Sequence, residues 1–156
     1  MAHAARNAAK ILKFARQAGW KILHIQHEEA DPAAGFLVRG TKGAEIASVV
    51  APLAGEGVLV KNYPNSFRET NLSTLLTVAE EVVIVGAMSN MCIDATARAA
   101  FDLGFSVTVV EDACAASALE FQGEPISASV VHGCFMAALA SGYGKVTKTE
   151  EVISGS

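Results

Sequence analysis

Long hydrophobic runs are missing from this sequence, although its composition is apolar. The residue types AVILMFWYC make up 51% of the 156 residues. They occur in short runs of Val, Ile, Leu and Ala, well below the ~18 consecutive apolar residues that a membrane span requires. We therefore expect no membrane partner, and a chain of this length predicts a single domain over residues 1–156.

An excess of positive charge is also missing. The chain has 12 Lys and Arg residues against 16 Asp and Glu residues, which gives a net charge of −4. No basic stripe is available to follow a phosphate backbone, so we expect no nucleic-acid partner. The glycine-rich loops G-x-G-x-x-G and G-x-x-x-x-G-K-[ST] do not occur either, and we expect no bound cofactor.

Cysteine is rare. The three cysteines, Cys92, Cys114 and Cys134, form no C-x-x-C pair and no zinc-type spacing. The N-terminal segment lacks the continuous apolar stretch of a signal peptide. Together these features predict a protein of a reducing compartment, the cytoplasm.

Predicted strands alternate with predicted helices along the chain. Apolar residues recur every three or four positions in residues 5–17, which predicts an amphipathic helix. Short apolar runs predict strands at residues 20–26, 57–61, 81–86, 106–111 and 145–149, and further helices are predicted at 72–79, 93–103 and 126–141. This alternation predicts an α/β fold with a doubly wound, mostly parallel sheet, whose ligands bind beyond the carboxyl ends of the strands.

The thiol of Cys92 follows a predicted strand and a tight turn, and it stands where a predicted helix begins. A helix N-terminus favours the thiolate through the helix dipole, and its free N–H groups can stabilise an oxyanion. The alternative is that Cys92 is a small buried hydrophobic residue, the usual role of a free cysteine. Cys114 and Cys134 lack this setting, and we expect both to pack in the interior.

Two more polar side chains follow predicted strands. Lys61 ends the strand at residues 57–61. If Lys61 lies near Cys92, its charge would stabilise the thiolate and it could later pass on a proton. The alternative is that the Lys61 side chain extends into solvent. We expect its amine within about 6 Å of the Cys92 sulfur. His27 opens the polar loop after the strand at residues 20–26, so we expect it to contact a substrate.

Several segments resemble the isochorismatase-like cysteine hydrolases, a family that includes nicotinamidases and N-carbamoyl amidohydrolases. Residues 86–92, GAMSNMC, are similar to the family element G-x-x-[ST]-x-x-C. Lys61 and the following NYPNSF resemble the family's lysine segment, in which the lysine is followed by a Ser/Ala-Phe pair. In this sequence the pair is Ser66-Phe67. EDACAA from residue 111 and VHGCFMAALA from residue 131 resemble later parts of the family. The similarity extends over nearly the whole chain.

The resemblance implies a fold, a reaction and a set of site residues. It implies a three-layer, Rossmann-like sheet and the hydrolysis of a small amide or related C–N bond. Cys92 would form a thioester with the small-molecule substrate, and Lys61 would assist with charge and proton transfer. A cis peptide between Ala87 and Met88 would aim the Met88 N–H at the oxyanion, and Phe67 would contact the substrate. A homo-oligomer, dimer or tetramer, is also implied.

One part of the family pattern has no match here. Family members carry a catalytic aspartate on a first strand, central in a sheet of order 3-2-1-4-5-6. The resemblance therefore predicts a sheet without its first central strand, either because the chain starts at an internal methionine or because it is a truncated relative. A catalytically silent, oligomer-forming homologue is the alternative function.

Two other branches of the family fit the sequence less well. Cleavage of the vinyl ether of isochorismate does not rely on the cysteine, so the presence of Cys92 argues against it. The D-x-H metal signature of the nicotinamidase branch is replaced by QHEEAD at residues 26–31. We expect no catalytic metal.

Overall fold

The computed structural model of the protein describes residues 1–77 and 79–155. It begins with helix α1 (Ala2–Gln17), which buries Ala8, Ile11 and Ala15 at three- and four-residue spacing. This spacing places the three side chains on one face of the helix, toward the sheet. The predicted helix at residues 5–17 is confirmed.

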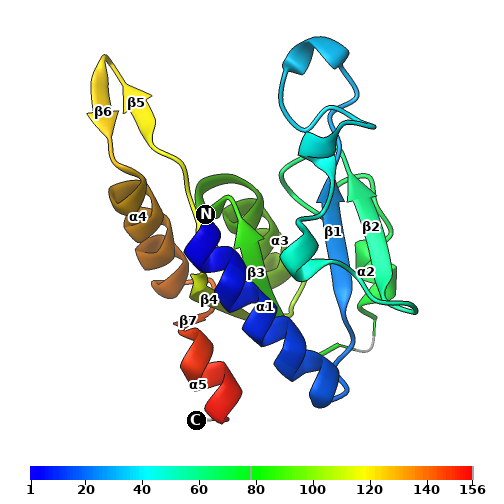
Figure 1. Ribbon diagram of the computed structural model, residues 1–156. Coiled ribbons are helices and arrows are strands. Elements are labelled where there is room, and N and C mark those ends of the chain that lie inside the picture. Colours follow the sequence, from blue (N-terminus) through cyan, green and yellow to red (C-terminus); the bar gives the residue numbers. More distant parts are fainter. Residues whose placement is uncertain (78, 156) are drawn as a thin grey trace.

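Two parallel sheets form the centre of the fold. In the first, β1 (Leu23–His27) pairs with β2 (Gly57–Lys61). In the second, β3 (Glu81–Ala87), β4 (Ser106–Ala115) and β7 (Lys145–Thr147) pair in the order β3–β4–β7. Within the described residues, β1 and β3 are not paired with each other (Figure 1). This is the break that the family's strand order predicts when its first strand is lacking.

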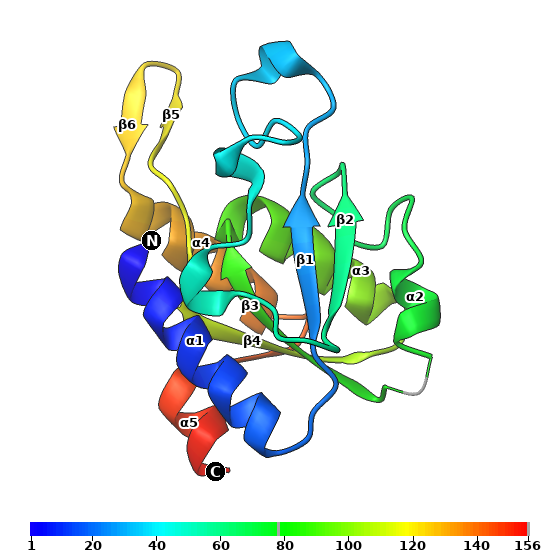
Figure 2. The same ribbon diagram turned by 45° about the vertical axis from the view of Figure 1, so that its right-hand side comes forward.

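Helices cover both faces of the β3–β4–β7 sheet. The elements not yet named are η1 (Pro32–Ala34), η2 (Lys42–Ala44), η3 (Ser48–Val50), α2 (Leu72–Leu75), the π-helix η4 (Ser89–Ile93), α3 (Asp94–Asp102), β5 (Leu119–Phe121), β6 (Glu124–Ile126), α4 (Ala128–Ala140) and α5 (Thr149–Ser154). Figure 2 shows α1 and α5 on one side of this sheet and α3 and α4 on the other. The predicted α/β architecture is confirmed.

The core follows the alternation of side chains along β4. Val109 belongs to the cluster under α3 and α4, and its neighbour Val110 belongs to the cluster under α1. Successive residues of a strand point to opposite faces, so one strand supplies both cores. The main hydrophobic core therefore lies around β4, directly beside the strand that leads to Cys92.

Some predicted boundaries are wrong. The helix expected at residues 72–79 ends at Leu75, and its residue 78 lies outside the described residues. The last strand ends at Thr147, because the N–H and the hydroxyl of Thr149 donate to the Asp112 carboxylate at 2.8 and 2.7 Å and α5 begins there. Helix α5 was not predicted.

The β5–β6 hairpin was not predicted either. Its turn is Gln122-Gly123, and both residues have positive φ, 53° and 83°. Positive φ at both central positions is typical of a type I′ hairpin turn, which usually contains Asn-Gly or Asp-Gly. Gln at the first position hides that signal in the sequence.

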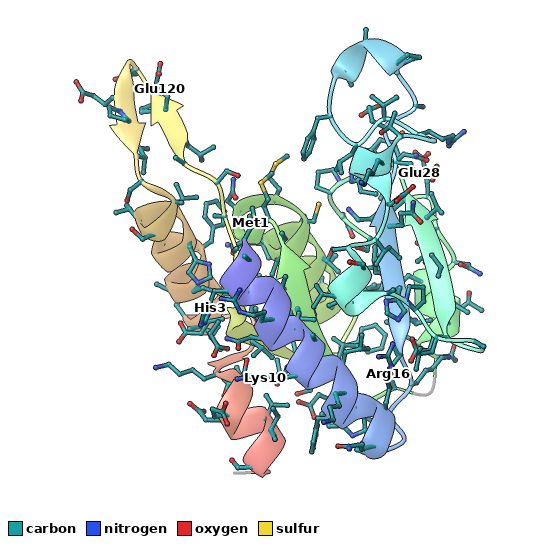
Figure 3. All side chains as sticks on the ribbon, viewed as in Figure 1. Met1, His3, Lys10, Arg16, Glu28 and Glu120 are labelled. Atoms are coloured by element: carbon teal, nitrogen blue, oxygen red, sulfur yellow. The ribbon has the colours of Figure 1, made fainter. Side chains whose placement is uncertain are left out.

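The β1–β2 pair is tied to α1 through Glu56. Arg16 donates two hydrogen bonds to the Glu56 carboxylate at 2.7 and 2.8 Å, and His24 Nε2 donates a third at 2.8 Å. Figure 3 shows Arg16 near the end of α1, where the helix approaches β1. The Arg16 guanidinium holds the pKa of Glu56 well below its usual range, and the Leu53 N–H and His24 act in the same direction. The carboxylate is therefore ionised at neutral pH.

Candidate active site

Strands from the two sheets bring Lys61 and Cys92 together. Lys61 is the last residue of β2, and Cys92 lies in η4, directly after β3. The Lys61 side chain is buried, with 4% of its surface exposed, and its Nζ lies 3.2 Å from Cys92 Sγ. The predicted convergence of the two side chains is confirmed, and the alternative that Lys61 extends into solvent is wrong.

The Lys61 amine has three further neighbours. It donates to the carbonyl oxygens of Tyr63 and Pro64 at 2.8 and 3.1 Å, and His27 Nδ1 lies 3.2 Å away. An ammonium group carries three protons. When the two carbonyls take one each, a single proton remains for His27 and Cys92 to share. The carbonyls thus fix the amine, and the third proton faces the reactive side of the site.

His27 faces this amine as a neutral ring. Burial lowers the pKa of the His27 imidazole, the charge of Lys61 lowers it further, and Glu29 opposes the shift only in part. A neutral His27 accepts the Lys61 proton at Nδ1 and carries its own proton on Nε2. The structure therefore brings His27 into the same group as Lys61 and Cys92. Its contact with a substrate stays a prediction.

The turn before Cys92 is held by several hydrogen bonds. The peptide between Ala87 and Met88 is cis, at the position that the family resemblance implied. The Met88 carbonyl accepts the N–H groups of Met91 and Ile93 at 3.1 and 3.2 Å. These bonds place Cys92 inside the first turn of a helical segment that continues into α3. The role of the Met88 N–H in binding an oxyanion stays a prediction.

Phe67 packs against the hydrophobic core. Its ring stacks on Phe105 with the ring centroids 6.2 Å apart, and it packs against the core under α3 and α4. The structure thus gives Phe67 a packing role. Its contact with a substrate stays a prediction.

The other two cysteines differ from each other. Cys114 is buried, as predicted, and burial raises the pKa of its thiol to about 12. Cys134 is exposed, so its predicted packing role is wrong. The buried face of α4 is formed by Val131, Met136 and Leu139. Because α4 is apolar nearly all round, its periodicity did not show which face is buried.

Sequence reasoning missed two polar pairs beside the nucleophile. Ser89 is fully buried and its hydroxyl hydrogen-bonds to His132 Nδ1 at 2.8 Å. The hydroxyls of Ser66 and Thr96 are 2.9 Å apart. Ser89 could have been found, because it is the [ST] of the G-x-x-[ST]-x-x-C element. No sequence signal pointed to His132 or Thr96.

Among the described residues, no carboxylate contacts the Lys61 amine, and no cluster of metal-ligating side chains is present. Across residues 1–77 and 79–155, Lys61 forms no ion pair with a carboxylate. The same ranges hold no group of three or more His, Cys, Asp or Glu residues that could hold a metal ion. Nor do these ranges include a helix long and apolar enough to cross a membrane. The site brings together a thiol, an amine and a neutral imidazole.

Comparisons with known proteins agree with the motifs. The profile of the isochorismatase domain matches residues 1–134. The isochorismatase family protein YddQ of Bacillus subtilis is 44% identical over 149 residues, which cover 94% of this chain and 83% of YddQ. The maleamate amidohydrolase of Pseudomonas putida is 34% identical over 124 residues, which cover 70% of this chain and 58% of that enzyme.

A solved structure matches the fold as well. The crystal structure described as an isochorismatase hydrolase from Oleispira antarctica superposes with a TM-score of 0.94 at 45% identity. The match covers 98% of this chain and 82% of that one. The two sheets and the helices around them therefore belong to a fold that other proteins share.

Proposed function

The chain belongs to the isochorismatase family, whose members similar to it include hydrolases, and from this premise we propose that it hydrolyses a small amide or related C–N bond through a thioester on Cys92. The contact of 3.2 Å between Lys61 Nζ and Cys92 Sγ carries the proposal. A buried positive charge beside the sulfur favours the thiolate, which is the nucleophilic form of cysteine. The neighbouring helix start acts in the same direction.

The proposed reaction has two halves. The Cys92 thiolate attacks the carbonyl carbon of the amide, and the N–H groups of Met88 and Cys92 stabilise the negative oxygen. The C–N bond then breaks, the Lys61 ammonium gives a proton to the leaving amine, and a thioester remains. Water attacks the thioester, the neutral Lys61 amine takes a proton from that water, and the thiolate leaves. The products are a carboxylic acid and an amine, and the site returns to its first state.

His27 and Phe67 complete the proposal. With Nδ1 turned to Lys61, the His27 Nε2–H is left to donate to a polar group of the substrate. Phe67 follows Lys61 by six residues and would border the substrate through the loop that both share. We propose no metal and no cofactor for these steps, because a thiol, an amine and two N–H groups supply them.

The expected rate of amide hydrolysis depends on how many groups assist proton transfer. In the proposed reaction, Lys61 is both the acid and the base. No carboxylate of the described residues contacts Lys61 to assist these proton transfers, and general acid–base assistance is typically worth about 10²–10⁴-fold. We therefore expect slow turnover of unactivated amides by residues 1–156. The same observation favours the second candidate function, a catalytically silent, oligomer-forming homologue.

Acylation by an activated ester separates the two functions. An ester such as p-nitrophenyl acetate has a good leaving group and needs little acid assistance, so it tests the nucleophile alone. We expect mass spectrometry to find an acetyl group on Cys92 that disappears with time in water. Exposed Cys134 serves as a reference thiol in the same molecule, and Cys92→Ser is the control. Acetylation of Cys92 no faster than of Cys134 would support the silent homologue.

Exposed apolar side chains and unpaired cysteines bear on the assembly and location of the protein. Phe36, Phe121 and Val58 are large apolar side chains that lie exposed on the surface. Such side chains favour association, and we propose a homo-oligomer, a dimer or tetramer, made of single-domain chains. We propose the cytoplasm as its location because the three cysteines are unpaired. A compact monomer in sedimentation at micromolar concentration would contradict the oligomer.

A further inference from the structure

The hydroxyl of Thr96 lies at the junction between the two halves of the site, and the proposed reaction does not use it. Thr96 Oγ1 accepts the Ser66 N–H at 3.1 Å and lies 2.9 Å from the Ser66 hydroxyl. It also donates to the Pro64 carbonyl at 3.4 Å. Thr96 belongs to α3, whereas Ser66 and Pro64 belong to the loop after β2. These contacts therefore join the segment of the nucleophile to the segment of the lysine.

The protons in this group can be assigned. Thr96 gives its single hydroxyl proton to the Pro64 carbonyl, and its oxygen accepts from the N–H and the hydroxyl of Ser66. One donor and two acceptor positions are thus all in use. Ser66 is buried, with 3% of its surface exposed. A buried hydroxyl that loses its partner is costly, so the group is a defined connection rather than an exposed surface contact.

The Pro64 carbonyl links Thr96 to the Lys61 amine. This oxygen accepts from Lys61 Nζ at 3.1 Å and from Thr96 Oγ1 at 3.4 Å. A shift of the carbonyl moves one of the two groups that fix the amine. The amine is 3.2 Å from Cys92 Sγ, and interaction between charges falls with distance. Thr96 can therefore act on the Lys61–Cys92 pair without touching either side chain.

Cys92 and Thr96 are four residues apart in one continuous helical segment, η4 followed by α3. Residues at this spacing lie on the same side of a helix. Cys92 contacts Lys61, and Thr96 contacts the loop that follows Lys61. The helix thus meets the β2 segment at two points about one turn apart, and the second point restrains the first.

We infer that Thr96 is a positioning residue that sets the separation of Lys61 and Cys92 through the Pro64 carbonyl. This inference rests on the proposed function, because it concerns the reactivity of the same pair. A merely structural Thr96 would change the stability of the protein but not the reactivity of Cys92 in the folded state. The two roles are distinguished by a reaction at Cys92 itself.

The test measures alkylation of Cys92 by iodoacetamide as a function of pH, with peptide mass spectrometry. Thr96→Val keeps the shape and removes the hydroxyl. We expect it to slow alkylation at pH 7 by about fivefold, the size of one lost hydrogen bond, and to shift the pH–rate profile upward. Thr96→Ser keeps the hydroxyl and should restore most of the rate. Equal rates for the wild type and a folded Thr96→Val protein would overturn the inference.

A double-mutant cycle with Lys61→Gln shows whether Thr96 acts through the lysine. In the Lys61→Gln background, we expect Thr96→Val to leave the alkylation rate unchanged. A fivefold loss that persists there would overturn the inference. If Lys61→Gln alone has no effect on the rate, the proposed reactive pair fails instead. If the Thr96→Val protein does not fold, Thr96→Ala is used in both experiments instead. It removes the same hydroxyl, and alanine is a strong helix former.

Discussion

The two sheets of this protein are stabilised in different ways. Both faces of the β3–β4–β7 sheet are covered by helices, and Val109 and Val110 of β4 are buried in two separate cores. In the β1–β2 pair, Val58 and Val60 are 47% and 44% exposed. This pair is attached through the polar contacts of Glu56 with α1 and through the contacts of Lys61 with the site.

The difference matters because the site takes one residue from each sheet. Cys92 follows β3, which pairs with the well-buried β4, and Lys61 ends β2, whose Val58 and Val60 are exposed. Full burial of an apolar side chain contributes about 1.5–3 kcal/mol, so the β3–β4–β7 sheet supplies most of the folding stability. The distance between the two reactive groups depends on a few polar contacts at the junction. Stability and reactivity should therefore respond to different substitutions.

The largest expected effect is on stability, and it compares a leucine of the core on the β3–β4–β7 sheet with a leucine in the loop before β2. Leu139 is 1% exposed in the core under α4, and Leu53, in the loop before β2, is 57% exposed. Leu139→Ala should lower the free energy of unfolding by about 2–5 kcal/mol, because it leaves a cavity. Leu53→Ala should change it by less than about 0.5 kcal/mol. Urea denaturation measures both, and equal losses would remove the contrast.

A smaller effect concerns reactivity alone. Lys61→Gln removes the positive charge beside Cys92 and should slow iodoacetamide alkylation of Cys92 at pH 7 by about tenfold or more. Lys13→Gln, at an exposed position of α1, is the matched control and should leave the rate unchanged. If both substitutions slow alkylation equally, the effect comes from net charge and not from the contact.

The smallest effect tests the attachment of the β1–β2 pair by its pH dependence. The pKa of Glu56 is lowered in the folded protein, chiefly by Arg16. The folded state therefore binds fewer protons at this group than the unfolded state, which stabilises the fold above the ordinary pKa of glutamate. This contribution is lost as the pH falls. Glu56→Gln should lower the Tm at pH 7, and the difference from the wild type should shrink toward pH 3.

Glu150→Gln is the control for this pH series, because Glu150 is largely exposed beside Lys10. Exposed pairs contribute little to stability, so its Tm should follow that of the wild type at every pH. A Tm difference for Glu56→Gln that stays constant from pH 7 to pH 3 would show that its effect is not electrostatic.

The parts of the fold that depend on local pattern could be predicted from the sequence. Strand β2 has the bounds that its apolar run predicts, residues 57–61, and α1 follows its apolar periodicity. The meeting of Lys61 and Cys92 could be predicted too, because parallel strands end at the same edge of a sheet. These features need only the order of the elements along the chain.

The contacts that hold the site could not be predicted in the same way. Ser89 and His132 are 43 residues apart, and Ser66 and Thr96 are 30 apart. Their meeting depends on how helices sit on the sheet, for which no periodic signal exists. Cys134 was misplaced because α4 is apolar on most of its surface. Local composition identifies the elements, whereas tertiary packing decides which polar side chains meet.

The central claim is that the fold, through Lys61, makes Cys92 more reactive than an ordinary thiol. The most direct measurement compares alkylation of the three cysteines in one molecule at pH 6.5, folded and in 8 M urea. In the folded protein, Cys92 should react faster than exposed Cys134, and Cys114, whose pKa burial raises to about 12, should react least. In urea the three rates should become similar. Equal rates for Cys92 and Cys134 in the folded protein would contradict the account.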